Sequence, residues 1–178
     1  MRKQLQTPLQ PPKHTGTQDY STDFDTLEKM EWAFSKGNIP FFEEVLDGKP
    51  SLLLRIHGVC MLADMKNEAA VPALCKALRE DPSPLARHEA AFSLGQLGFK
   101  SAVPALLEAM AVDESVLVRH ESAVALGSIG DESARNGLIA ACEDLDEDVR
   151  LSGEIALADL DFLKRLTSRT TITPTSRS

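Results

Sequence analysis

A repeat of 32 residues runs through the middle of the chain and limits the folds open to it. Residues 85–98, LARHEAAFSLGQLG, align at this offset with residues 117–130, LVRHESAVALGSIG. The register extends to the segments before and after this pair, at an offset of 32 or 31 residues. It aligns four arginines, Arg55, Arg87, Arg119 and Arg150, and four leucines, Leu62, Leu94, Leu126 and Leu157. A period of this length is typical of proteins in which helical units stack on one another.

Each repeat is predicted to form two helices. The first, residues 84–97 in one repeat, has apolar residues at helical spacing and ends beside a glycine, the residue best suited to a left-handed C-cap. The second, residues 101–111, has Pro104 in its opening turn, where a missing N–H is tolerated. Because a pair of about 30 residues cannot bury its apolar face alone, we predict an all-α fold, an α-solenoid of about four to five helical hairpins.

Three segments are expected along the chain. Residues 1–23 are rich in Gln, Thr and Pro and are predicted to be disordered or extended, and residues 167–178 are predicted to form a flexible Ser/Thr/Arg tail. Residues 24–166 are predicted to be the repeat domain. It would begin with an irregular helix pair at 24–36 and 39–46 and end with a capping helix at 148–166.

Charge and composition exclude several functional classes. The formal net charge is −8, and residues 24–162 hold 12 basic and 25 acidic residues. We therefore expect cationic partners and no nucleic-acid partner. We expect no membrane segment and a cytoplasmic protein, because no long apolar run and no signal-peptide pattern occur. Cys60, Cys75 and Cys142 have no paired spacing, so we expect free thiols packed within helices.

The arginine of each repeat follows an aspartate by six to eight residues. The aspartates are Asp47, Asp81, Asp113 and Asp144. We interpret these residues as a structural ladder of Asp–Arg pairs along the solenoid.

Two consecutive repeats place a His-Glu pair directly after the arginine, as His88-Glu89 and His120-Glu121. Equivalent positions on neighbouring solenoid helices lie on one face, with helix axes roughly 8–10 Å apart. Imidazole and carboxylate are ligands that iron, manganese and zinc accept, and two histidines with one carboxylate form the ligand set of non-haem iron(II) oxygenases. The alternative is that the pairs are surface groups or hydrogen-bonded core groups that replicate with the repeat. We favour a metal site, because two pairs occur in register.

The flanking repeats carry other residues at these two positions, Ile56-His57 and Leu151-Ser152. His57 stands at the position of the glutamates. It could border a substrate entrance, or it could be a solvated or hydrogen-bonded helix histidine.

Residues 51–163 resemble one half of deoxyhypusine hydroxylase, a HEAT-repeat di-iron monooxygenase family. The match is closest at 85–98 and 116–131, where family halves carry a similar HE-A-x-x-LGQ and then VRHE-A-x-x-LG-x-IGD. In that family two pseudo-symmetric halves each supply two His-Glu pairs, with the di-iron centre between them. The family hydroxylates a deoxyhypusine side chain on translation initiation factor 5A.

The resemblance implies HEAT-like repeats, iron as the metal with O2 as co-substrate, and a cationic amine or lysine-derived side chain of a protein as a possible substrate. Only one half is present here, so either two chains assemble the centre, or the site is mononuclear, or the metal function is lost. Because both pairs are intact, we expect a homodimer with two irons. Each iron would take His88, His120 and Glu121 from one chain and Glu89 from the other.

The sequence thus predicts a metal-dependent, O2-activating hydroxylase. Two alternatives from other classes remain. One is a HEAT-repeat scaffold without enzymatic activity that binds a protein partner on its extended surface. The other is a HEAT protein similar to tetrapyrrole lyases, which share the repeat but need not share the paired His-Glu dipeptides.

Overall fold

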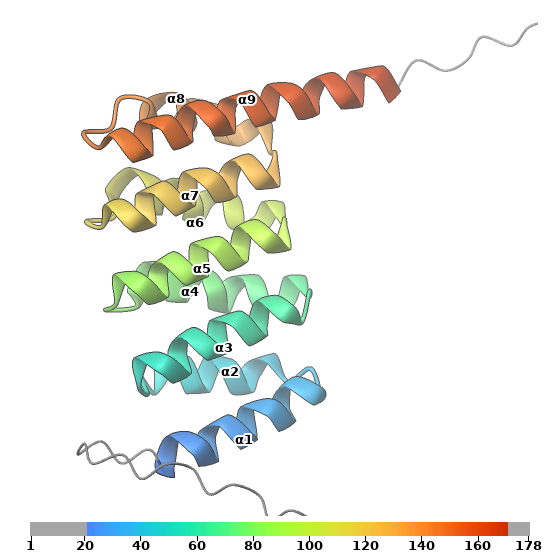
Figure 1. The fold of residues 1–178 in the computed structure, drawn as a ribbon. Helices are drawn as coiled ribbons and strands as arrows, with labels where there is room; N and C mark the ends of the chain where they lie inside the picture. Colours follow the sequence, from blue (N-terminus) through green and yellow to red (C-terminus); the bar gives the residue numbers. More distant parts are fainter. Residues whose placement is uncertain (1–20, 171–178) are drawn as a thin grey trace, which may run out of the picture.

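The computed structural model describes residues 21–170, which form a stack of α-helices joined by short turns and 3-10 helices (Figure 1). The α-helices of this range are α1 (Ser21–Ser35), α2 (Ile39–Asp47), α3 (Leu52–Asp64), α4 (Val71–Glu80), α5 (Pro84–Leu97), α6 (Val103–Val112), α7 (Val116–Ile129), α8 (Arg135–Ala141) and α9 (Glu147–Thr170). The predicted all-α solenoid is confirmed. No helix in this range combines the length and hydrophobicity needed to cross a membrane.

The helices form two layers. In Figure 1, α3, α5, α7 and α9 lie in front, and α2, α4, α6 and α8 lie behind them. Each front helix packs on its equivalent in the next repeat, α3 on α5, α5 on α7 and α7 on α9. Equivalent residues of successive repeats therefore follow one another along a single face of the molecule.

The predicted helix bounds hold closely. The helix predicted at 84–97 is α5, and the one predicted at 101–111 is a 3-10 turn (Lys100–Ala102) followed by α6. Helix α1 begins at Ser21 and α9 ends at Thr170, so both reach into the segments predicted as tails. The rest of those segments, residues 1–20 and 171–178, lies outside the described residues.

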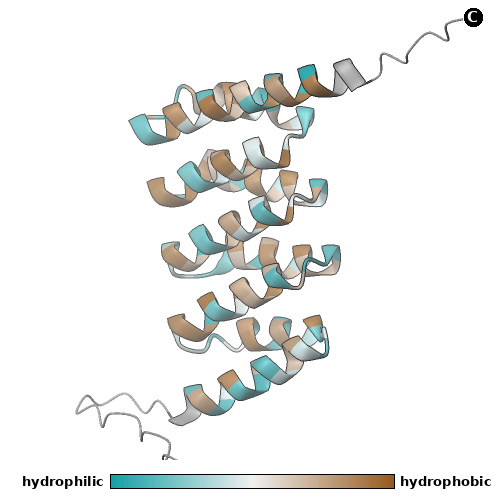
Figure 2. Cartoon of the chain, turned by 45° about the vertical axis from the view of Figure 1, so that its right-hand side comes forward, coloured by the Kyte–Doolittle hydropathy of each residue, from teal (hydrophilic) through white to brown (hydrophobic). Residues whose placement is uncertain are grey.

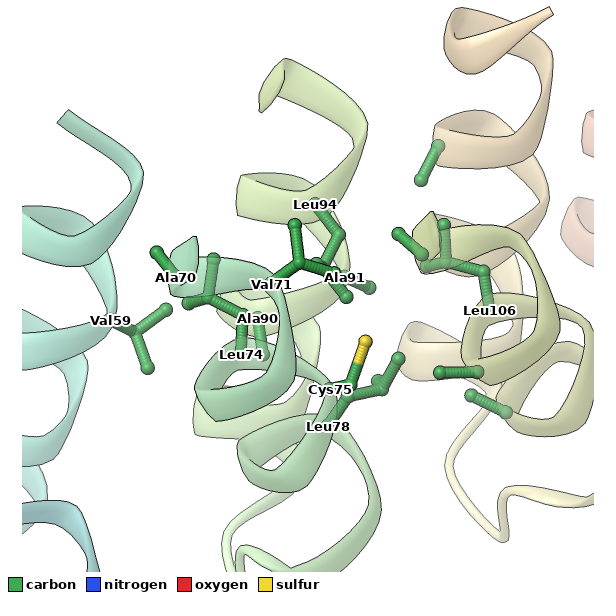
Figure 3. Close-up of a cluster of buried hydrophobic side chains, with 14 of the residues drawn as sticks. Val59, Ala70, Val71, Leu74, Cys75, Leu78, Ala90, Ala91, Leu94 and Leu106 are labelled. Carbon is green, nitrogen blue, oxygen red and sulfur yellow. The ribbon is translucent and has the colours of Figure 1, made fainter. Parts of the chain in front are cut away.

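The core lies between the two layers and consists mainly of alanine, leucine and valine side chains (Figure 3). Leu74, Leu94 and Leu106 are fully buried, and Ala90 and Ala91 of α5 lie among them. Alanine is small enough to let neighbouring helices approach closely. The core thus fixes the spacing between successive front helices.

Glycines make the close stacking possible. Gly98 and Gly130 end α5 and α7 in the left-handed conformation, with φ of 71° and 68°, which confirms the predicted C-caps. Gly95 and Gly127 lie where one front helix meets the next. A Cβ atom at either position would be 2.9 Å from the Cα of Ala125 or Ala156, respectively, closer than carbon atoms approach in folded proteins.

The Asp–Arg ladder is confirmed, but its partners differ from those suggested by proximity in sequence. Arg87 donates from Nε and Nη2 to the carboxylate of Asp113 in the following repeat, at 2.8 and 2.9 Å. Its Nη1 donates to the backbone carbonyl of the preceding Asp81 at 2.9 Å. Arg55 and Arg119 bond in the same way to the carboxylates of Asp81 and Asp144. These three arginines thus each tie two successive turns together, whereas Arg150, among the described residues, donates only to the backbone carbonyls of Asp144 and Leu145.

Asp47 is an exception to the ladder. It forms an exposed ion pair with Lys76 of α4 and has no contact with the repeat arginine. The carboxylate of Asp81 takes the place next to Arg55.

Candidate metal centre

The four predicted ligands lie on two neighbouring front helices. His88 and Glu89 belong to α5, and His120 and Glu121 belong to α7. His88, Glu89 and His120 are half-buried and Glu121 is buried. We call these residues the His–Glu row. The close stacking of α5 on α7 brings the two pairs onto one face, as the repeat predicts.

One contact joins the two pairs. His88 Nε2 lies 3.2 Å from Glu121 Oε2, with 23% and 12% of the two side chains exposed. His88 therefore contacts the glutamate of the next repeat, Glu121, and not the histidine of the next repeat, His120. The other ring nitrogen of His88, Nδ1, is buried without a hydrogen-bond partner among the described residues.

The other two members of the row have different partners. His120 Nδ1 lies 2.7 Å from the hydroxyl of Ser152 on α9. Glu89 accepts a hydrogen bond from the Cys60 thiol on α3, with Sγ 3.3 Å from Oε1. Burial, followed by the hydrogen bond to Glu89, raises the pKa of Cys60 to about 11. Cys60 is therefore a neutral donor to the Glu89 carboxylate near pH 7.

These contacts follow one register along the stack. Ser152 occupies on α9 the position that Glu121 occupies on α7, so His120 meets Ser152 as His88 meets Glu121. In the preceding repeat, the histidine position is occupied by Ile56 of α3, which has no polar side-chain atom to bond Glu89. The thiol of Cys60, one turn further along α3, donates a hydrogen bond to the Glu89 carboxylate instead. The repeat alignment identified the position of Ser152, but its contact with His120 was not foreseen, and neither was that of Cys60.

His57 lies half-buried on α3, at the glutamate position of its repeat. Its side chain forms no hydrogen bond or ion pair with the other described residues. Its predicted place beside a substrate entrance stays a prediction.

The three cysteines are free, as predicted. Cys75 is buried in the core between the layers (Figure 3). Burial raises the pKa of the Cys75 thiol and the pKa of the Cys142 thiol.

The donors fit part of a metal site. Two ligand atoms bound at right angles to one ion, each at about 2.1 Å, lie roughly 3 Å apart. The 3.2 Å between His88 Nε2 and Glu121 Oε2 is close to that separation. Within residues 21–170, however, no three His, Cys, Asp or Glu side chains come close enough together to hold an ion. The chain therefore presents an imidazole–carboxylate pair to which further ligands would have to be added.

Apolar side chains flank the His–Glu row on both sides. We call them the apolar rim: Leu53, Leu85 and Leu117 lie four residues before the glutamate position of their repeats, and Phe92, Val124 and Ile155 lie three residues after it, so helical spacing puts them on the face of the row. Between 39% and 62% of each of these residues is exposed. Hydrophobic residues, brown in Figure 2, occur along these helices and alternate with hydrophilic ones. Exposed apolar groups around a polar centre are typical of a surface that contacts another protein.

Comparisons with known proteins agree with this architecture. Residues 71–158 match the family of HEAT repeats. Human deoxyhypusine hydroxylase in complex with glycerol is similar in structure over 78% of this chain, with a TM-score of 0.68 and 26% sequence identity. The chain covers 49% of that enzyme, about half its length.

A chain of the complex of CpcE and CpcF of phycocyanin lyase from Nostoc sp. is similar over 95% of this chain and 76% of its own length. Its TM-score is 0.59 and its identity 21%, a level that shows the fold alone. No curated protein sequence matches the chain. The HEAT-repeat fold and the resemblance to deoxyhypusine hydroxylase are confirmed.

Proposed function

We propose that this HEAT-repeat chain, similar to one half of deoxyhypusine hydroxylase, is a metal-dependent hydroxylase whose iron site is completed by a second copy of the chain. His88, His120 and Glu121 would hold one iron, and Glu89 would reach the iron of the partner. The observation that carries the proposal is the contact between His88 Nε2 and Glu121 Oε2 across two successive repeats.

The bonding around this contact supports a ligand role. In the Asp–Arg ladder, both carboxylate oxygens of Asp113 accept hydrogen bonds. In the His–Glu row, by contrast, the hydrogen bonds recorded for residues 21–170 engage neither Nε2 of His120 nor the second oxygen of Glu121. Of the row's polar atoms, only Nδ1 of His88 is buried without a partner among the described residues, so these two atoms are open to solvent. The row thus has donor atoms in reserve, as a site for an additional ligand requires.

The apolar rim supports completion by a second copy. It surrounds a polar centre that holds only part of a ligand set, so a facing copy would bury the rim and bring a second His–Glu row opposite the first. A twofold axis between the rows makes both contacts identical, and twofold dimers are the commonest symmetric assembly. The part of human deoxyhypusine hydroxylase that this chain matches is about half of that enzyme's length, so two copies of this chain would match the length of one chain of the enzyme.

Iron bound by two histidines and a carboxylate supplies the activation of O2. The residues of this chain would bind and orient the metal, and the acidic surface would attract a cationic substrate such as a lysine-derived amine on a protein. The rim would exclude water from the centre once the two copies meet. We propose that this reaction takes place in the cytoplasm.

Iron content of single variants tests the ligand assignment. After anaerobic loading with iron(II) and removal of excess metal, the parent is expected to hold about one iron per chain. His88→Ala and His120→Ala each remove one nitrogen ligand and should lose most of it, with helicity unchanged by circular dichroism. His57→Ala, which changes the same residue type one repeat away, is the matched control and should keep its iron.

Two outcomes would contradict the assignment. Either ligand variant could hold as much iron as the parent, or the control could lose its iron. Hydroxylation itself is tested by incubating the iron-loaded protein with O2, a reductant and a peptide that carries deoxyhypusine. Gain of one oxygen atom by the peptide, absent with His88→Ala, would support the proposed substrate class.

A protein-binding scaffold without enzymatic activity is the second candidate. It is favoured by the exposed apolar rim alone, since that surface suits a protein partner even without metal. A parent that takes up no iron but binds another protein through the rim would favour the scaffold.

A further inference from the structure

We infer that Ser152 is a positioning residue that holds His120 in the tautomer with its proton on Nδ1, leaving the lone pair of Nε2 available for a ligand. The inference deepens the proposed function and rests on it, because it concerns how one of the proposed ligands is oriented. It starts from two short contacts of one buried hydroxyl group.

The Ser152 hydroxyl has one proton and two close neighbours. Its Oγ lies 2.6 Å from the backbone carbonyl of Asp148, four residues earlier in α9, and 2.7 Å from Nδ1 of His120. A carbonyl oxygen cannot donate, so the contact with Asp148 uses the hydroxyl proton. Toward His120, Oγ can then only accept. Nδ1 of His120 therefore carries the ring proton.

The tautomer follows from this bond. In a neutral imidazole one nitrogen is a donor and the other an acceptor, so a proton on Nδ1 leaves a lone pair on Nε2. Ser152 is only 4% exposed, which keeps water from competing for the bond. A hydrogen bond to the second nitrogen is the usual way in which proteins orient a histidine that binds metal.

The repeat shows that this arrangement is particular to His120. His88, one repeat earlier, directs Nε2 at Glu121, and its Nδ1 is buried with no partner among the described residues. Ser152 stands where a third glutamate would stand if the pattern continued. A glutamate there would place a negative charge beside His120, whereas a serine orients the ring through a neutral bond.

The tautomer can be measured directly in the metal-free protein. Two-bond nitrogen–proton NMR spectra of uniformly 15N-labelled protein distinguish the two neutral tautomers from each other and from the protonated ring, so they are recorded at increasing pH until the signal no longer changes. His120→Ala identifies the signal. We expect a protonated Nδ1 for His120 in the parent and a mixture of tautomers in Ser152→Ala.

Ser122→Ala is the matched control. Ser122 is a buried serine of α7 whose hydroxyl has no partner among the described residues, so its loss should leave the His120 signal unchanged. Cobalt(II) alone serves as the metal probe, followed by its visible absorption. Ser152→Ala should weaken cobalt binding about 10- to 100-fold, and Ser122→Ala should not.

The outcomes separate this inference from the proposed function. A proton on Nε2 of His120 in the parent would overturn the role of Ser152, as would a Ser152→Ala variant with the tautomer and cobalt affinity of the parent. A parent that binds no cobalt would contradict the proposed metal site. In that case the NMR spectra of parent and Ser152→Ala would still decide whether Ser152 sets the tautomer.

Discussion

Arg87 and Arg119 directly precede the two histidines in sequence, yet they bond away from them. Arg87 is 6% exposed and donates to Asp113 and to the backbone, which places it in the ladder that joins successive repeats. The neighbouring histidine points to the row on α5 and α7. Adjacent residues of one helix therefore do different work, one in stability and one in the candidate site.

This division predicts the effect of removing Arg87. Arg87→Ala leaves Asp113 buried without its partner, so the free energy of unfolding should fall by about 3 kcal/mol. Urea denaturation measures the loss. Arg79→Ala, an exposed arginine of α4, is the matched control and should change stability by less than about 0.5 kcal/mol. Unchanged stability of Arg87→Ala, with loss of iron, would instead assign Arg87 to the metal site.

Asp131 predicts a pH dependence of stability. Hydrogen bonds from Ser133 and then Lys100 lower the pKa of Asp131 to about 2, below the ordinary value of 3.8. Because the folded state binds this proton less tightly than the unfolded state, the carboxylate stabilises the fold above about pH 4, and the contribution disappears as the pH falls toward 2.

Asp131→Asn keeps a cap for the 3-10 helix Glu132–Ala134 but has no charge to titrate. At pH 7 the parent should be more stable by about 1 kcal/mol, given that Lys100 is exposed and its ion pair is screened by water. The difference should shrink as the pH falls from 4 to 2 in urea denaturation series. A difference that stays constant over that range would refute the assigned cause.

The sequence predicted which side chains share a face but not which of them touch. The 32-residue period places His88 and His120 at equivalent positions, and this alignment suggested that the two histidines converge. The structure shows instead that His88 meets Glu121 and that His120 meets Ser152. The lateral shift between neighbouring helices decides these partners, and it depends on side-chain packing that no periodicity records.

Among the helices, the spacing of α5 and α7 is what brings His88 to Glu121. Gly95 lies against Ala125 at that crossing, where a Cβ atom would be 2.9 Å from backbone. The helix bounds themselves were predictable, because Gly98 and Gly130 mark the ends of α5 and α7, and Pro72 and Pro104 mark the starts of α4 and α6. The spacing was not, because it follows from which small residues meet across the interface.

Gly95→Ala should therefore affect stability and metal binding together. The added methyl group forces α5 and α7 apart, with an expected loss of about 1–3 kcal/mol in the free energy of unfolding. It should also weaken cobalt binding, since the row loses its spacing. Gly48→Ala is the control. Gly48 follows α2, its backbone is in the right-handed helical conformation, and a Cβ atom there would be at ordinary contact distance, 3.4 Å, from the carbonyl oxygen of Glu44. A Gly95→Ala variant with the cobalt affinity of the parent would contradict the claim that metal binding depends on the spacing of α5 and α7.

For the molecule as a whole, the proposed function depends on how two solenoids meet. The predicted solenoid and its repeats are confirmed, while the dimer stays a prediction, since a single chain carries no direct record of its partner. We propose that the apolar rim, in which Ile155 is 62% exposed, forms the contact between the two copies. The surrounding acidic surface would repel a second copy unless metal offset the charge at the centre.

A charge placed on the rim should prevent the dimer. Ile155→Glu introduces a carboxylate that two facing copies would have to bury, so the dimer should dissociate at concentrations at which the parent remains associated. Leu145→Glu is the matched control, because Leu145 is 99% exposed in the turn before α9, away from the rim. Size-exclusion chromatography with light scattering compares the two. Dissociation of both variants, or of neither, would argue against the rim as the interface.

Sedimentation velocity of the iron-loaded and the chelator-treated protein tests the central claim most directly, because it measures metal binding and assembly on the same molecule. In the proposed dimer, metal ions would neutralise the carboxylates that face each other across the twofold axis, so metal binding and dimerisation should be linked. We expect a dimer with about one iron per chain that dissociates when the iron is removed. An iron-loaded protein that remains monomeric at tens of micromolar would contradict a site shared between two chains.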